Sequence, residues 1–230
     1  MTTHLTNYEK ALHSEPVVRG GFWSGVARFR FYRDLGKPVL DKILILLAAP
    51  LVFPVIALLA LLVALDGGKP FYTQLRVGKG GKSFRMWKIR TMVHNADARL
   101  ESHLASDPAA RAEWTTTQKL KNDPRITPIG HFLRKSSLDE LPQLFNVLGG
   151  SMALVGPRPM MLHQEPLYTG QAYFRLAPGI TGLWQISDRN NCDFIDRVHY
   201  DETYGKSVSL VTDLRILFKT LAVVLRGTGY

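Results

Sequence analysis

Cysteine is nearly absent from this chain, with Cys192 the only one in 230 residues. A single cysteine excludes an intramolecular disulfide and any zinc site with two or more cysteine ligands, and it is typical of a reducing compartment. Acidic residues are also few, 19 against 29 Lys and Arg, which gives a net charge of +10 at pH 7. This surplus predicts attraction to polyanions such as nucleic acid, anionic lipid or nucleotide sugars. The length favours one catalytic domain with appendages.

Charged residues are missing altogether from Ile43 to Leu65, a stretch about as long as a bilayer-spanning helix. Pro50 and Pro54 each remove an amide donor and crowd the carbonyl four residues earlier, so they predict a kink. Lys and Arg residues stand on both sides of the stretch, whereas a simple spanning helix keeps its positive flank on the cytoplasmic side. The residues alone leave two interpretations open, a re-entrant helix that enters and returns or a kinked transmembrane helix.

Residues 1–36 contain a run in which aromatic side chains alternate with arginines, from Trp23 to Arg33. Such side chains suit the headgroup level of a membrane, because the apolar part is buried while the charge stays in water. We therefore expect a basic, aromatic interfacial segment here. An RNA-binding patch is less favoured, because no RNP-type sequence accompanies the run.

A β-hairpin is predicted after the apolar stretch. Phe71–Leu75 and Phe84–Ile89 are rich in strand-forming residues, and Gly78, Gly80 and Gly81 supply a turn. The turn sequence RVGKGGKS is close to a P-loop, but Arg76 stands where the first glycine is required. We therefore interpret it as a turn.

Two further segments predict helices. Residues 96–117 are polar and alanine-rich, which favours a surface helix or a mobile excursion. Residues 213–225 are amphipathic, with Leu214, Leu217, Leu221 and Val224 on one face. This second helix is expected to pack on the domain or to lie on a membrane.

Asp139 and Glu140 form an adjacent carboxylate pair before a run of apolar residues at helical spacing. The spacing predicts a helix that starts at the pair, either with a capping box from Ser137 to Glu140 or with Pro142 in the first turn. A helix N-terminus favours ionised carboxylates and bound phosphate, as a carboxylate nucleophile or a magnesium ligand requires. Acidic residues in a first turn are also common as structural caps.

Basic residues surround this pair in the sequence. In the GPRP run, Pro157 and Pro159 restrict the backbone on either side of Arg158, and Gly156 leaves room for a ligand to approach. The guanidinium is therefore held in a defined direction, which suits bidentate phosphate binding. Phosphoryl transfer depends mainly on positioning and charge neutralisation, which matches this inventory. Further candidate phosphate contacts are Lys88, Arg90, Arg134 and Lys135.

With these motifs assembled, the chain resembles the bacterial sugar transferases, the monotopic polyprenyl-phosphate phosphoglycosyl transferases, and in particular their short exopolysaccharide-initiating type. The resemblance runs from about Lys37 to Tyr230. It is carried by YTQLRVG, WKIRTM, NDPRITPIGHFLRKSSLDELPQLFNVL, LVGPRP and PGITGLWQ in that order.

The resemblance implies transfer of a sugar-1-phosphate from a UDP-sugar, UDP-galactose or UDP-glucose, to polyprenyl (undecaprenyl) phosphate with release of UMP. It implies that Asp139 is the nucleophile that forms a covalent aspartyl-phosphosugar, and that Asp139 and Glu140 hold Mg²⁺. Lys88, Arg134 and Arg158 would stabilise the phosphates. The implied nucleotide contacts are Gly156, Pro157, Pro159, Gln185 and Arg189.

The implied fold is α+β and mostly helical, with a re-entrant helix at 37–65 broken at Pro54, a small hairpin, and a transferase domain at 66–230 with amphipathic interfacial helices. The implied location is the cytoplasmic face of the bacterial inner membrane, with anionic lipids as partners and no nucleic acid, and with a homo-oligomer left open. Two positions depart from the family pattern, Phe53 in place of a serine and Ser151 in place of an acid.

Two alternatives remain at this stage. One is a non-catalytic membrane adaptor of a glycan-assembly complex, although retention of Asp139, Glu140 and Arg158 argues against it. The other is a basic nucleic-acid-binding protein, which the clustering of charge beside an apolar segment disfavours.

Overall fold

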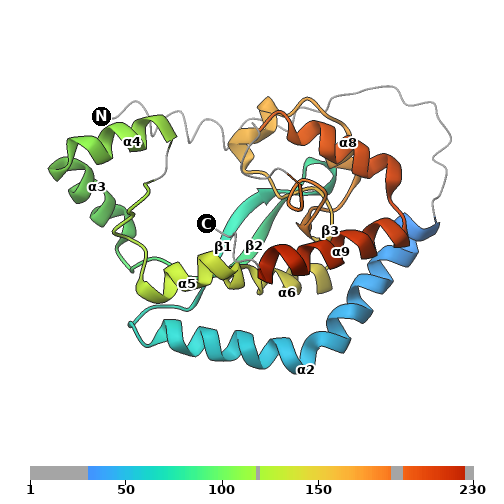
Figure 1. Cartoon of the computed structure of the whole chain (residues 1–230), viewed down its shortest axis with the longest axis horizontal. Helices are drawn as coiled ribbons and strands as arrows, with labels where there is room; N and C mark the ends of the chain where they lie inside the picture. Colours follow the sequence, from blue (N-terminus) through green and yellow to red (C-terminus); the bar gives the residue numbers. More distant parts are fainter. Residues whose placement is uncertain (1–30, 118–119, 188–193, 226–230) are drawn as a thin grey trace. The chain divides into compact units, whose positions relative to one another are not determined.

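The computed structural model describes residues 31–117, 120–187 and 194–225, and these are mostly helical with two small sheets (Figure 1). The expected α+β class is thus confirmed at this coarse level. Most of the interfacial segment expected at 1–36 lies outside the described residues. The elements in chain order are η1 (Tyr32–Gly36), α2 (Lys37–Ala64), β1 (Phe71–Val77), η2 (Lys79–Gly81), β2 (Ser83–Ile89), α3 (Ala96–Ser106), α4 (Pro108–Thr117), α5 (Pro128–Ser136), η3 (Leu138–Glu140), α6 (Gln143–Leu148), β3 (Ala153–Val155), η4 (Leu162–Leu167), α7 (Ala172–Arg175), β4 (Gly179–Thr181), α8 (Arg197–Ser207) and α9 (Leu210–Leu225).

The predicted hairpin is confirmed. Strands β1 and β2 pair antiparallel from Phe71 opposite Ile89 to Val77 opposite Ser83. Gly80 and Gly81 close the turn with φ of 71° and 77°, a left-handed backbone that glycine adopts without strain. The register places Tyr72 opposite Lys88, so these two side chains share one face of the hairpin.

Helix α2 is one continuous helix that contains both Pro50 and Pro54. Figure 1 shows it as two limbs in different directions, one descending and one running across the bottom of the view, as expected for a helix with prolines in its interior. The stretch Tyr32–Ala64 is, among the described residues, the one helix long and apolar enough to cross a membrane by length and composition.

One face of α2 packs on the rest of the chain along its whole length. In the first limb Ile45 joins a buried cluster with Met86 of β2 and Val147 of α6. In the second limb Leu59 and Val63 pack with residues of β2 and α5. Only 22% of the most apolar window of this helix is buried, so its other face is left uncovered.

A buried polar cluster ties the start of α2 to α9. The Nζ atom of Lys37 lies 2.8 Å from Oδ2 of Asp213, and Oδ1 of Asp213 accepts a 2.6 Å hydrogen bond from the hydroxyl of Tyr204. One turn along α2, Asp41 accepts a bond from the backbone N–H of Leu154. Buried charges are stable only when paired and hydrogen-bonded, so this cluster fixes the two helices against β3.

Strands β3 and β4 form a two-stranded parallel sheet, in which β3 leads into the GPRP turn and β4 lies within the PGITG motif. The backbones approach so closely that a Cβ at Gly156 would collide with the carbonyl oxygen of Ala177. Glycine is therefore required at this crossing. The sheet brings Arg158, just after β3, near Trp184 and Gln185, just after β4.

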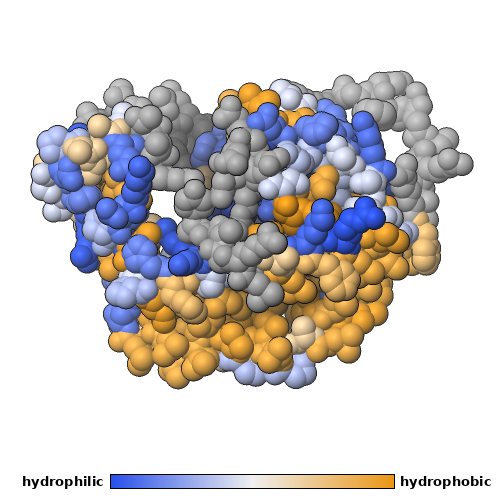
Figure 2. Space-filling view, in the orientation of Figure 1, coloured by the Kyte–Doolittle hydropathy of each residue, from blue (hydrophilic) through white to orange (hydrophobic). Residues whose placement is uncertain are grey.

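The segment 96–117 forms two helices, α3 and α4, in place of the single helix or excursion expected from sequence. In α9, Asp213 and Ile216 are buried, whereas Leu214, Phe218 and Leu221 are exposed. Much of the leucine stripe therefore faces outward. With the uncovered face of α2 it contributes to the exposed apolar surface along the lower half of the view in Figure 2.

Candidate active site

The carboxylate pair lies in a 3₁₀ turn between two helices. Helix α5 ends at Ser137, whose backbone is left-handed at φ 57°, and η3 then holds Asp139 and Glu140. Helix α6 begins at Gln143 with Pro142 as its N-cap residue. The predicted helix start at the pair is therefore wrong, and so is the capping box, because Ser137 makes no side-chain cap bond. The physical reason is that the left-handed backbone of Ser137 ends α5 and, together with Pro142, confines the pair to a short 3₁₀ turn before α6.

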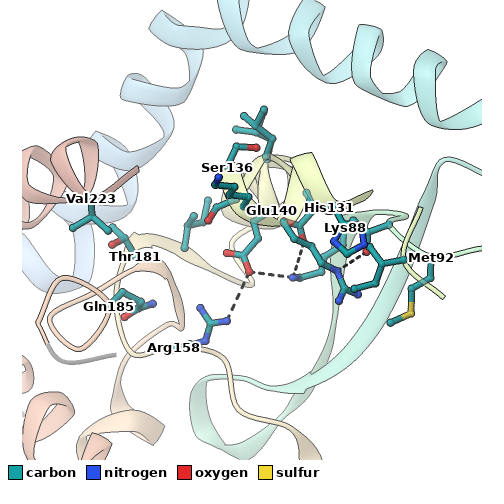
Figure 3. A pocket seen from close by; sticks show the side chains of 18 of the residues that line it. Lys88, Met92, His131, Ser136, Glu140, Arg158, Thr181, Gln185 and Val223 are labelled. Carbon is teal, nitrogen blue, oxygen red and sulfur yellow. Dashed lines mark hydrogen bonds and ion pairs between the residues drawn. The ribbon is translucent and has the colours of Figure 1, made fainter. Parts of the chain in front are cut away.

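Lys88 joins both carboxylates. Its Nζ atom lies 3.1 Å from Oδ2 of Asp139 and 3.0 Å from Oε1 of Glu140. On the other side of Glu140, the Nη2 atom of Arg158 is 3.8 Å from the same Oε1 atom. Figure 3 shows Lys88 and Arg158 approaching Glu140 from two directions. The structure thus brings together four of the predicted residues.

The pKa values within this cluster shift in different directions. Burial raises the pKa of Asp139 above its usual range and outweighs the attraction of Lys88. Burial acts on Glu140 in the same sense, but the charges of Lys88 and Arg158 outweigh it and hold its pKa below the usual range. The pKa of Lys88 is raised, because its two carboxylate neighbours outweigh burial. Lys88 is therefore a firmly protonated cation at neutral pH.

The cluster lies in a cavity of about 1340 Å³, which is larger than most small-molecule sites. Arg134 also lines it, and the Nε atom of Arg134 donates a 2.9 Å hydrogen bond to Oγ1 of Thr91. Basic and polar side chains thus approach the carboxylates from several elements. The further polar lining includes Asp123, His131, Lys135, Ser136 and Arg197.

Gln185 is 7% exposed and lines the same cavity (Figure 3). Neither its Nε2 nor its Oε1 atom has a hydrogen-bond partner among the described residues. Buried amides are nearly always paired, so a carboxamide of this kind indicates a ligand or water as its partner. This agrees with the expected place of Gln185 near a substrate.

Arg90 is not among the residues that line the cavity. Its guanidinium donates to the carbonyl oxygens of Val63, Lys69 and Met92 and pairs with Asp66. These partners belong to the end of α2 and the loops around the hairpin. Arg90 therefore clamps the chain that leaves α2, away from the lining of this cavity.

Other candidate residues fall in different places. Gly156 shapes the turn by close packing, and neither it nor Pro157 or Pro159 lines the cavity, so the GPRP run acts through the aim of Arg158. Arg189 lies outside the described residues. Ser151 does not line the cavity either, and its hydroxyl bonds to the Asn146 side chain at 3.1 Å. Ser151, which stands where the family has an acid, is therefore part of a turn beside α6.

Several residues with an evident place at the site were missed from sequence. Trp184 lines the cavity under the guanidinium of Arg197, 4.3 Å from the ring centroid. Tyr72 lines it from β1, directly opposite Lys88 of β2, so the pairing of the predicted hairpin was the available signal. Arg76, on the same strand face as Tyr72, does not line the cavity, but its charge acts on Glu140; it is 8% exposed and has no partner for Nε or Nη1 in the described part of the chain.

A divalent cation at this site would need carboxylate or phosphate oxygens as ligands. No group of three or more His, Cys, Asp or Glu side chains that could hold a metal exists in residues 31–117, 120–187 and 194–225. Mg²⁺, however, is commonly bound by one or two carboxylates together with substrate phosphates. Asp139 and Glu140 have the chemistry of such a pair, so the residues present fit this cation.

Residues 32–227 match the family described as bacterial sugar transferase, and the chain belongs to this family. It is 49% identical over 195 residues to the UDP-galactose-lipid carrier transferase of Erwinia amylovora, which covers 84% of this chain and 41% of the relative. It is 48% identical over 202 residues to the undecaprenyl-phosphate galactose phosphotransferase of Salmonella typhimurium, covering 87% and 42%. The chain thus spans less than half of these two relatives.

A third relative has a similar length. The chain is 44% identical over 198 residues to the exopolysaccharide production protein ExoY of Sinorhizobium fredii, which covers 85% of this chain and 88% of the relative.

Proposed function

We propose that this protein transfers a sugar-1-phosphate from a UDP-sugar to undecaprenyl phosphate and releases UMP. The observation that carries the proposal is the cluster of Asp139, Lys88 and Glu140, in which one half-buried ammonium pairs with two carboxylates in a cavity lined by arginines. The names of the relatives support galactose as the sugar and exopolysaccharide production as the process, for which this would be the first membrane step. UDP-glucose is the second donor to consider.

The proposed chemistry has two steps at one phosphorus atom. An oxygen of Asp139 attacks the β-phosphorus of the UDP-sugar, the bond to the bridging oxygen breaks, and UMP leaves with the electron pair. An oxygen of undecaprenyl phosphate then attacks the same phosphorus. The Asp139 carboxylate is regenerated, and the product is a lipid diphosphate that carries the sugar.

The surrounding side chains have distinct tasks in this proposal. Lys88 lies within hydrogen-bond reach of Asp139 and offsets the repulsion between the carboxylate and the incoming phosphate. Arg158 and Arg134 reach the cavity from other elements and suit the phosphate oxygens. Gln185 offers an unpaired donor and acceptor to the nucleotide.

Mg²⁺ would be held by Asp139 and Glu140 together with phosphate oxygens of the substrate. When bound, it supplies charge neutralisation at the diphosphate. Chelation with EDTA is expected to abolish UMP release, and added Mg²⁺ to restore it. Full turnover in EDTA would contradict this part of the proposal.

The membrane arrangement in this proposal is re-entrant, with the transferase domain on the cytoplasmic face of the inner membrane and anionic lipids around it. The packing of α2 supports it. Ile45 and Val63 lie eighteen residues apart, about 27 Å along a helix, yet both pack on elements that follow residue 66. A straight helix crossing a hydrocarbon core of about 30 Å would carry one of these residues away from a domain on the other side.

The experiment that tests the function uses the full chain in lipid nanodiscs with a panel of UDP-sugars. UDP-galactose or UDP-glucose is expected to yield UMP, together with a lipid-linked sugar when undecaprenyl phosphate is present. Absence of UMP from every UDP-sugar in the panel would overturn the proposal.

A further inference from the structure

The cavity that contains the carboxylate pair also has an apolar part. Leu141 lines it from the turn before α6, Leu144 from α6, Ile180 from β4, and Thr220 and Val223 from α9. All five side chains are half-buried, and none of them is charged. We call these five residues the apolar arm of the cavity.

The arm has a rigid lining. Leu144 and Ile180 pack against the buried cluster of Ile45, Met86, Val147 and Met152. Across β4 and α9, the hydroxyls of Thr181 and Thr220 lie 2.7 Å apart in a hydrogen bond. Figure 3 shows Val223 and Thr181 next to each other on the side of the cavity away from Lys88. The arm is therefore fixed by the fold and does not require a rearrangement to exist.

Exposed apolar side chains flank the arm on both helices. Phe145 of α6 is exposed and stacks on Phe53 of α2 at 5.5 Å between ring centroids. Phe218 and Leu221 of α9 are exposed as well. The arm thus links the carboxylate pair with elements that carry the apolar surface in Figure 2.

The two ends of the cavity differ in polarity. Lys88, Arg134 and Arg158 stand at the carboxylate end, where a phosphate group is favoured. The arm offers the hydrocarbon of Leu141, Leu144, Ile180 and Val223 and one hydroxyl, that of Thr220, which is hydrogen-bonded to Thr181, so it suits an apolar chain. A nucleotide sugar has no hydrocarbon chain to match the arm, whereas a lipid phosphate has a phosphate for the basic end and a hydrocarbon chain for the arm.

Resting on the proposed function, we infer that the apolar arm binds the isoprenoid units next to the phosphate of the lipid acceptor. The acceptor would then reach the site from the membrane between α6 and α9, while the nucleotide occupies the rest of the cavity. Blocking the arm should therefore impair the second step and leave the first step intact.

The test blocks the arm after folding. Val223→Cys is made in a Cys192→Ser background and modified with a bulky maleimide, and Ala222→Cys, an exposed neighbour that does not line the cavity, is the matched control. Both assays use the UDP-sugar that the unmodified protein accepts. The first measures UMP release without acceptor, and the second measures formation of the lipid-linked sugar with undecaprenyl phosphate. Thr220→Cys, treated in the same way, replaces Val223→Cys if that variant does not fold.

We expect modification at Val223 to lower lipid-linked product at least tenfold while one UMP per protein is still released, and modification at Ala222 to change neither. Equal product from both modified proteins would overturn the inference. So would an equal loss of UMP release, since the arm would then serve the donor. If the unmodified protein releases no UMP, the proposed function itself fails and this inference with it.

Discussion

The Nζ atom of Lys88 lies 3.1 Å from Oδ2 of Asp139, although the two residues are 51 positions apart in the chain. The hairpin supplies the cation and the turn between α5 and α6 supplies the carboxylates. Because Asp139 is buried and its pKa is raised, the ammonium is the main group that keeps this carboxylate ionised. The nucleophile proposed here therefore depends on a contact between separate elements.

Replacing Lys88 by Met should leave two adjacent carboxylates, Asp139 buried and Glu140 half-buried, without their shared partner. We expect UMP release at pH 7 to fall about 100-fold. The remaining activity should shift to higher pH, because the pKa of Asp139 rises further and the carboxylate ionises only there. Initial rates between pH 6 and 9 measure both effects. Lys82→Met, an exposed position in the same hairpin, is the control. An unchanged pH profile would refute the role of Lys88.

Arg90→Ala should act on stability, since Arg90 bonds the end of α2 and does not line the cavity that contains the carboxylate pair. Loss of these bonds to three backbone carbonyls is expected to cost about 3 kcal/mol of unfolding free energy. Thermal unfolding of the purified protein measures this cost, with Arg99→Ala on the exposed face of α3 as control. The KM for the UDP-sugar should stay unchanged at temperatures where the variant is folded. A raised KM without a change in unfolding would instead restore Arg90 to the substrate site.

Asp201 gives a prediction about pH. It is buried and accepts a 2.9 Å bond from the hydroxyl of Tyr168, and burial raises its pKa from 3.8 to about 7. Between pH 4 and 7 the folded protein therefore binds a proton that the unfolded chain has released, so this group makes stability fall as pH rises through that window. In Asp201→Asn this group cannot titrate, so the fall of a few kcal/mol in the free energy of unfolding across the window should disappear. The variant should still fold, because an amide oxygen can accept the bond from Tyr168.

The measurement for Asp201 is urea unfolding at several pH values from 4 to 8. The wild-type curve should decline more steeply with pH than the Asp201→Asn curve. Glu101→Gln, an exposed site on α3, should keep the wild-type slope. Parallel curves for wild type and Asp201→Asn would show that Asp201 does not titrate in this range.

Reporters fused to the two termini test the re-entrant topology. Because both limbs of α2 pack on elements that follow it, we expect both reporters on the cytoplasmic side. Protease accessibility in sealed vesicles provides the assay. Reporters on opposite sides of the membrane would mean that the chain crosses the bilayer.

Local sequence was sufficient for features that depend on local physics. The glycine turn and the strand-forming residues on either side of it predicted the hairpin, and the absence of charge from Ile43 to Leu65 predicted the apolar helix with its prolines. Asp139, Glu140 and Arg158 were selected by their chemistry, and the structure places them within one cluster. The exact start of α6 was missed because a left-handed Ser137 and Pro142 together produce a 3₁₀ turn.

Features that depend on distant partners were not predictable in this way. Arg90 is close to Lys88 in sequence, but it lies beyond the last residue of β2, and its partners come from the end of α2 and the following loop. In α9 the leucine stripe suggested the buried face, yet Lys37 and Tyr204 draw Asp213 inward and leave Leu221 exposed. The position of Arg90 and the orientation of α9 are thus both set by charged and polar partners that lie far away in the sequence.

The most direct test of the central claim is single-turnover release of UMP with no acceptor present, followed by intact-protein mass spectrometry. The wild-type protein should release one UMP per chain and gain the mass of a hexose phosphate, whereas Asp139→Asn should do neither while it still partitions into membranes. UMP release by Asp139→Asn at the wild-type rate would contradict the assignment of Asp139 as the nucleophile.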